Sequence, residues 1–143
     1  MNYFDTSALI KRFTEEPGSS RVEALIAADP RLATSKVAYA EAHAGLARKL
    51  REGALSAAAH QRVSRRFDSH WRAYIRVDLL DPLLALTRDL VGRHPLRGFD
   101  AIHLASAIRL QQQLGEPIQL VASDDRLLTA ARNEGLATLD VRS

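Results

Sequence analysis

Four acidic residues could do chemistry together, and three of them stand where the chain changes from one kind of segment to another. Asp5 ends the apolar start of the chain, Asp124 follows the apolar run 118–122, and Asp100 stands at the start of an apolar helical segment. Glu41 lies six residues into a different helical segment. An acid at a helix start is ordinarily a cap, because it complements the positive end of the helix. Capping therefore accounts for three of these acids separately, but not for Glu41.

A cluster of these carboxylates would mark a cation site. Unneutralised carboxylates within a few ångströms repel each other and raise each other's pKa. The sequence contains no cysteine, so the ligands would be oxygen atoms, which favours Mg²⁺ or Mn²⁺. Such an ion generates hydroxide, orients a phosphate and neutralises the charge that develops during in-line attack. The chemistry predicted from these residues is metal-dependent hydrolysis of a phosphodiester.

Cationic side chains gather in two consecutive helical segments that we expect to form a hairpin. A groove that binds a polyanion needs such cations along one wall. We therefore predict contacts with a phosphate backbone, that of RNA if the substrate is RNA, from Arg48, Lys49, Arg51, Arg62, Arg65 and Arg66. The alternative is a solubilising outer face, with Glu52 and Asp68 nearby to balance the charge.

Short apolar runs typical of strands alternate with segments of helical periodicity. The predicted strands are Tyr3–Phe4, 31–34, 75–80, 118–122 and 137–141. The first predicted helix follows a cap at Asp5, Thr6 or Ser7 and ends near Phe13. The other predicted helices are 15–29, 36–53, 55–74, 81–91, a central one from residue 99 to Gly115, and 125–135.

This alternation predicts an α/β fold of three layers, α/β/α, with a small, mostly parallel central sheet and a helical hairpin inserted before the third strand. Crossover helices run antiparallel to the strands, so helix starts and strand ends share one edge. Glu41 lies only about 9 Å from the start of its helix at 1.5 Å per residue, beside a predicted apolar stripe of Val37, Ala40, Ala44, Ala47 and Leu50. All four acids can reach this edge, where open α/β sheets bind ligands.

The length of 143 residues is that of one ordinary domain, residues 1–143. The formal charge of +3 is a weak indication of a nucleic-acid partner, although Arg is the predominant base. Asp5 interrupts the first apolar run, and no run approaches the length of a membrane span. We therefore expect a soluble cytoplasmic protein with no membrane contact.

Four segments carry a resemblance to a known family. DTSALIKRF at Asp5, AEAHAGL at Glu41, GFDAIHLASA at Asp100 and LVASDDRLLTAA at Asp124 resemble the PIN-domain family, particularly its VapC-type ribonuclease toxins. The similarity covers nearly the whole chain, and four motifs in this order and spacing are more specific than any one of them.

The resemblance implies a compact PIN-like fold in which an acidic set binds Mg²⁺ or Mn²⁺ and hydrolyses RNA endonucleolytically. Carried over by position, this catalytic and metal-binding set is Asp5, Glu41, Asp100 and Asp124. Thr6 or Ser7 would contact a metal-bound water. The family's pattern of strand, Asp, two residues and Leu favours Asp124 over Asp125, which would then start the helix. The resemblance also implies a cognate antitoxin and a homodimer.

Two other hypotheses remain open from the sequence. One is a catalytically inactive PIN-fold module that binds RNA or a protein. The other is a phosphoryl-accepting Asp5, which is weaker because the acidic pair and the Lys that such a site needs do not stand out. His103 shares a helix face with Asp100, and we interpret it as a hydrogen-bonded core residue that at most supports a metal ligand.

Overall fold

Five short parallel strands form the centre of the structure, a computed structural model that describes residues 1–143. The strands are β1 (Asn2–Phe4), β2 (Leu32–Ser35), β3 (Ile75–Val77), β4 (Gln119–Ala122) and β5 (Ala137–Asp140). Their order in the sheet is β3-β2-β1-β4-β5, and every neighbouring pair is parallel. Later strands are added outward on either side of β1, so the switch point of the topology lies between β1 and β4.

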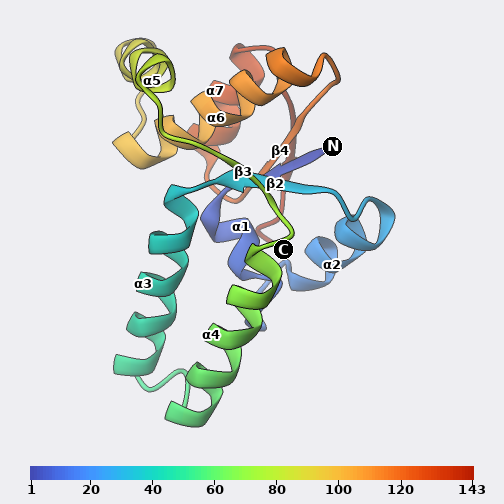
Figure 1. The fold of residues 1–143 in the computed structure, drawn as a ribbon, viewed down its shortest axis with the longest axis vertical. Coiled ribbons are helices and arrows are strands. Elements are labelled where there is room, and N and C mark those ends of the chain that lie inside the picture. The colour runs from blue at the N-terminus through green and yellow to red at the C-terminus, as the bar shows by residue number, and fades with distance from the viewer.

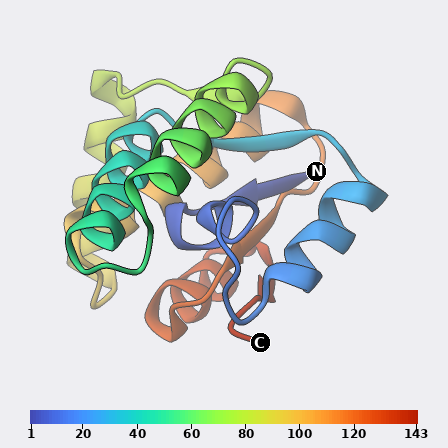
Figure 2. The same ribbon diagram turned by 90° about the horizontal axis from the view of Figure 1, so that it is seen from below.

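Helices cover both faces of this sheet. Figure 1 shows α5, α6 and α7 on one side and α1, α2, α3 and α4 on the other. Figure 2, seen from the second side, shows α3 and α4 running side by side as the predicted hairpin, with α2 apart from them. The helices are α1 (Thr6–Ile10), α2 (Ser19–Ala28), α3 (Val37–Arg51), α4 (Ala57–Trp71), α5 (Asp81–Arg93), α6 (Gly98–Leu114) and α7 (Asp125–Asn133). The predicted three-layer α/β/α fold is confirmed.

The sheet separates two apolar cores because successive strand residues point to opposite faces. Tyr3 and Leu120 pack with α5, α6 and α7 in one core, whereas Phe4 and Val121 pack with α1 to α4 in the other. Strands β1 and β4 are therefore buried on both sides, which explains their continuous apolar character. Helix α6 buries residues around much of its circumference, as its apolar sequence predicted.

Several predicted elements are shorter than expected, among them α2, which spans Ser19–Ala28 rather than 15–29, and α4, which spans Ala57–Trp71 rather than 55–74. Strand β3 ends at Val77 rather than residue 80, because it is an edge strand paired only with β2, which ends at Ser35 opposite Val77. Helix α1 ends at Ile10, and the chain continues to Phe13 in tight turns, in which the Lys11 N–H donates to the Ala8 carbonyl. No helix has the length and apolar character needed to cross a membrane.

The apolar stripe predicted for α3 is wrong. The buried residues of this helix are Ala38, Ala42 and Leu46, whereas Ala40 and Ala44 are exposed. The helix is thus rotated about its axis from the predicted orientation. Because Glu41 lies between Ala38 and Ala42 in the sequence, one helical turn from Ala38, this rotation carries Glu41 towards the interior.

Candidate active site

Asp5 is held at the end of β1 by its backbone and by its side chain. Its N–H donates to the Val121 carbonyl (3.1 Å), which extends the pairing of β1 with β4. Its Oδ1 accepts from the Ala8 N–H (2.9 Å), and the Ser7 hydroxyl lies 3.0 Å from both carboxylate oxygens. Asp5 is therefore itself the N-cap of α1, a role that we had left open to Thr6 or Ser7. Burial raises the pKa of this carboxyl group, which is 5% exposed.

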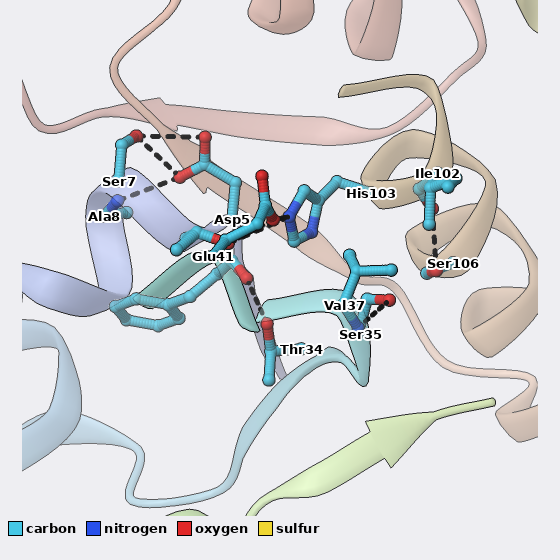
Figure 3. A network of polar contacts seen from close by, with 12 residues as sticks. Asp5, Ser7, Ala8, Thr34, Ser35, Val37, Glu41, Ile102, His103 and Ser106 are labelled. Carbon is cyan, nitrogen blue, oxygen red and sulfur yellow. Dashed lines mark hydrogen bonds and ion pairs between the residues drawn. The ribbon is translucent and has the colours of Figure 1, made fainter. Parts of the chain in front are cut away.

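Glu41 enters the site from the second turn of α3 and is held by two donors on one oxygen. The Thr6 hydroxyl donates to its Oε1 at 2.6 Å, and His103 Nε2 lies 2.8 Å from the same atom. Partial burial opposes ionisation, but these two hydrogen bonds prevail and hold the pKa of Glu41 below its usual value. Figure 3 shows the Glu41 carboxylate against the His103 ring, beside Asp5. The second oxygen, Oε2, makes no hydrogen bond within the protein.

His103 connects this carboxylate to the core. It is 1% exposed, and its Nδ1 lies 2.8 Å from the hydroxyl of fully buried Tyr3. A carboxylate only accepts hydrogen bonds, so Nε2 carries a hydrogen, and in the neutral ring Nδ1 accepts from Tyr3. The chain from Tyr3 through His103 to Glu41 thus joins β1, α6 and α3. This outcome agrees with the interpretation of His103 as a hydrogen-bonded core residue.

Asp100 and Asp124 stand at the starts of α6 and α7. Asp124 is the N-cap of α7, and its Oδ1 accepts from the Leu127 N–H at 2.9 Å. Asp100 lies in the first turn of α6, and its carboxylate has no hydrogen bond or ion pair within the protein. Burial, followed by repulsion from Asp124, raises the pKa of Asp100. The neighbouring Asp125 begins α7 as predicted and is bound instead by Arg142 (2.7 Å).

All four acids line one cavity of about 240 Å³ at the carboxyl edge of the sheet. Thr6, Ser7 and His103 line it too, together with Arg97, which the sequence analysis did not single out. The only local signal for Arg97 was its position one turn before Asp100. No three or more His, Asp or Glu side chains in the structure converge as a ready-made metal cage.

The six cations of the α3–α4 hairpin lie outside this cavity. Arg48 is seven residues beyond Glu41, about 10 Å further along α3. Lys49 pairs with Glu16 (3.8 Å), and Arg66 donates to the Arg12 carbonyl and lies over the Phe13 ring. The others, Arg51, Arg62 and Arg65, are exposed. Their contact with RNA stays a prediction.

The fold and the site define an α/β protein with a carboxylate-lined cavity at the switch point of a parallel sheet. Residues 3–133 match the PIN domain family. The chain belongs to this family. It is 37% identical over 134 residues to Ribonuclease VapC45 of Mycobacterium tuberculosis (strain CDC 1551 / Oshkosh), covering 93% of this chain and 90% of that protein.

Solved structures share the fold at low sequence identity. The structure of FitAB bound to an IR36 DNA fragment superposes with a TM-score of 0.70 at 15% identity, covering 100% of this chain and 96% of that chain. A toxin–antitoxin complex from Klebsiella pneumoniae gives a TM-score of 0.63 at 20% identity, covering 87% of each chain.

Proposed function

We propose that this protein is a metal-dependent endoribonuclease and the toxin of a toxin–antitoxin pair. The observation that carries the proposal is the meeting of Asp5, Glu41, Asp100 and Asp124, from four separate segments, around one cavity. The relative named Ribonuclease VapC45 supports RNA as the substrate class. The toxin–antitoxin complex of the same fold supports a cognate antitoxin as partner, and we extend the proposal to a homodimer on family resemblance.

The donor set fits Mg²⁺ or Mn²⁺. Asp100 has no protein partner, Glu41 keeps one oxygen free, and the raised pKa values of Asp5 and Asp100 are those of carboxyl groups that need a positive neighbour. Mg²⁺ keeps several waters and commonly uses only one or two carboxylates, so it does not require three converged side chains. When bound, the ion activates a water and neutralises charge on the phosphate.

The protein's own residues orient this chemistry. Asp5, Asp100 and Asp124 are fixed by strand ends and first helical turns, so little reorganisation accompanies binding. Ser7 donates its hydroxyl hydrogen to Asp5, which leaves its oxygen lone pairs free to accept from a water. Thr6 donates to Glu41 and lies 3.1 Å from His103 Nε2, which leaves one of its two lone pairs free. His103 and Thr6 together keep Glu41 ionised and immobile.

Cleavage of structured RNA by antitoxin-free protein in Mg²⁺ or Mn²⁺ tests the proposal. Asp5→Asn is the sharpest variant, because Asn is as good an N-cap as Asp but carries no charge. We expect Asp5→Asn to fold and to lose cleavage, whereas Asp89→Asn, an exposed acid beside Arg88, keeps it. If the parent cuts no RNA, the alternative of an inactive binding module is favoured. If Asp5→Asn cuts as well as the parent, the carboxylate cluster does not carry the cleavage and the proposed mechanism fails.

A further inference from the structure

A second polar cavity adjoins the acidic one. It measures about 270 Å³, is lined mainly by charged side chains, and shares Arg97, Asp100 and Asp124 with the first cavity. Its remaining walls are Pro95 and Arg126. The two cavities therefore form one continuous depression, with carboxylates towards the sheet and two guanidinium groups beside them.

Neither arginine has a partner in the protein. Arg97 and Arg126 are exposed, and neither takes part in an ion pair or a side-chain hydrogen bond. Some surface arginines, such as Arg31, Arg93 and Arg142, bind a carboxylate at 3.0 Å or less, whereas others, such as Arg62 and Arg65, have no such partner. What distinguishes Arg97 and Arg126 is that both line a cavity shared with the acids. The depression thus holds two guanidinium groups that make no hydrogen bond within the protein, although Arg97 lies near enough to attract the Asp100 carboxylate.

Helix electrostatics does not account for cations at these positions. Arg97 is the N-cap of α6 and Arg126 is the second residue of α7, and both are therefore at the positive ends of helices. Cations are favoured at the opposite, C-terminal end. Two departures from this rule that line the same cavity are typical of a functional site. An anion placed between them would be attracted by both side chains and by both helix ends.

The segment that carries Arg97 is tied to the rest of the fold. His94 Nε2 lies 2.6 Å from Oε2 of Glu134, which is the C-cap residue of α7. The Leu96 N–H donates to the His94 carbonyl at 2.8 Å. The Arg97 carbonyl in turn accepts from the Ala101 N–H at 3.0 Å. Because the backbone is fixed at both ends, the guanidinium group is delivered to the depression from a defined position.

We propose that Arg97 and Arg126 form a subsite for a backbone phosphate of single-stranded RNA, adjacent to the phosphate that the carboxylate site acts on. The inference rests on the proposed function, and it names how the same site binds its substrate. A guanidinium group matches phosphate with two parallel hydrogen bonds, which Lys does not reproduce. The subsite would hold the RNA strand across the acidic cavity, which none of the cations of the α3–α4 hairpin lines.

The salt dependence of RNA binding tests the subsite. The probe is a short fluorescein-labelled single-stranded RNA of mixed sequence, bound in EDTA so that no cleavage occurs and followed by anisotropy. Each phosphate contact contributes about 0.7 to the slope of log affinity against log salt for a single strand. Because the subsite binds one phosphate, we expect Arg97→Gln with Arg126→Gln to reduce the slope by about 0.7, and Arg97→Lys with Arg126→Lys to retain it.

The matched control is Arg31→Gln with Arg88→Gln. It removes the same charge from exposed residues, one before β2 at the opposite edge of the sheet and one on α5, and it should leave the slope unchanged. Melting temperatures should match the parent's for the Arg97 and Arg126 variants, because neither side chain has a partner. An equal slope change in the control, an unchanged slope in the glutamine variant, or a parent that does not bind the RNA would overturn the inference.

A kinetic measurement separates this inference from the proposed function. In Mg²⁺, the glutamine variant should raise KM and leave kcat unchanged, because a neighbouring phosphate is bound equally in the ground and transition states. A parent that binds RNA with the expected slope but cuts none would defeat the nuclease function and leave the subsite standing. A parent that cuts RNA while the glutamine variant keeps the parental KM and slope would defeat only the subsite.

Discussion

Tyr3→Phe is expected to weaken metal binding although Tyr3 does not line the acidic cavity. The Tyr3 hydroxyl lies 2.8 Å from His103 Nδ1, and His103 Nε2 lies 2.8 Å from Glu41 Oε1. Phe preserves the ring volume and its edge-on packing against His103 at 5.9 Å. Only the hydroxyl is lost. The His103 ring then loses the contact that fixes the position of Nδ1, so the hydrogen bond from Nε2 holds Glu41 less firmly.

The expected magnitudes follow from these contacts. A buried Nδ1 without a partner costs about 1–3 kcal/mol of the free energy of unfolding of the metal-free protein. Groups that orient a metal ligand typically change metal affinity by about 10- to 100-fold. Under excess Mn²⁺ each tenfold loss of affinity reduces the metal-dependent stabilisation by about 1.4 kcal/mol. Both losses should therefore appear in the same variant.

Urea unfolding of the parent and variant, with and without Mn²⁺, measures both quantities. Tyr74→Phe is the control, because Tyr74 is similarly buried but its hydroxyl meets only Arg12 Nη1 at a long 3.4 Å. That variant should keep the full Mn²⁺ stabilisation. If Tyr3→Phe lowers the stability of the metal-free protein and leaves the Mn²⁺ stabilisation intact, the chain through His103 does not orient Glu41 for the ion, and the reasoning is refuted.

Two further outcomes are expected. Asp100→Asn should stabilise the metal-free protein at neutral pH, because burial and then Asp124 raise the pKa of Asp100 in the folded state. A carboxyl pKa that is raised in the folded state lowers the free energy of unfolding of the parent as pH rises from the unfolded to the folded pKa. The stability gained by Asp100→Asn should therefore vanish below that pH window, which urea titrations at several pH values would measure. A gain that persists in acid would contradict this cause. Gly18→Ala should cost at least about 2 kcal/mol in the same assay, because Gly18 has φ +93° and a Cβ there would lie 1.9 Å from the Val141 carbonyl oxygen. Gly53→Ala, at φ +78° in open space, should cost only about 1–2 kcal/mol, and equal losses at the two glycines would refute the steric argument.

The acids at element boundaries were accessible to sequence reasoning because their positions depend on topology. Asp5 and Asp124 follow apolar runs, and parallel strands bring such ends to one edge. The structure adds that capping and lining the cavity are not alternatives. Both carboxylates accept a backbone N–H with Oδ1 and still face the cavity.

The side chains on helices were less accessible because a helix can rotate about its axis without any change in its boundaries. Glu41 was expected at the margin of a stripe through Ala40 and Ala44, but packing buries Ala38 and Ala42 and carries Glu41 inward. The abundance of cations in the α3–α4 hairpin was visible in the sequence. Its distance from the cavity depends on where the hairpin projects, which Figure 1 shows to be away from α6 and α7.

The sequence by itself determined the α/β alternation, the parallel sheet and the edge at which Asp5, Asp100 and Asp124 meet, since these follow from periodicity and chain direction. Only the tertiary structure decided that His103 bridges Tyr3 and Glu41, and that Arg97 rather than a hairpin cation faces the acids. Contacts of this kind join residues far apart in the chain. They depend on the relative rotation and distance of packed elements, which no local pattern encodes.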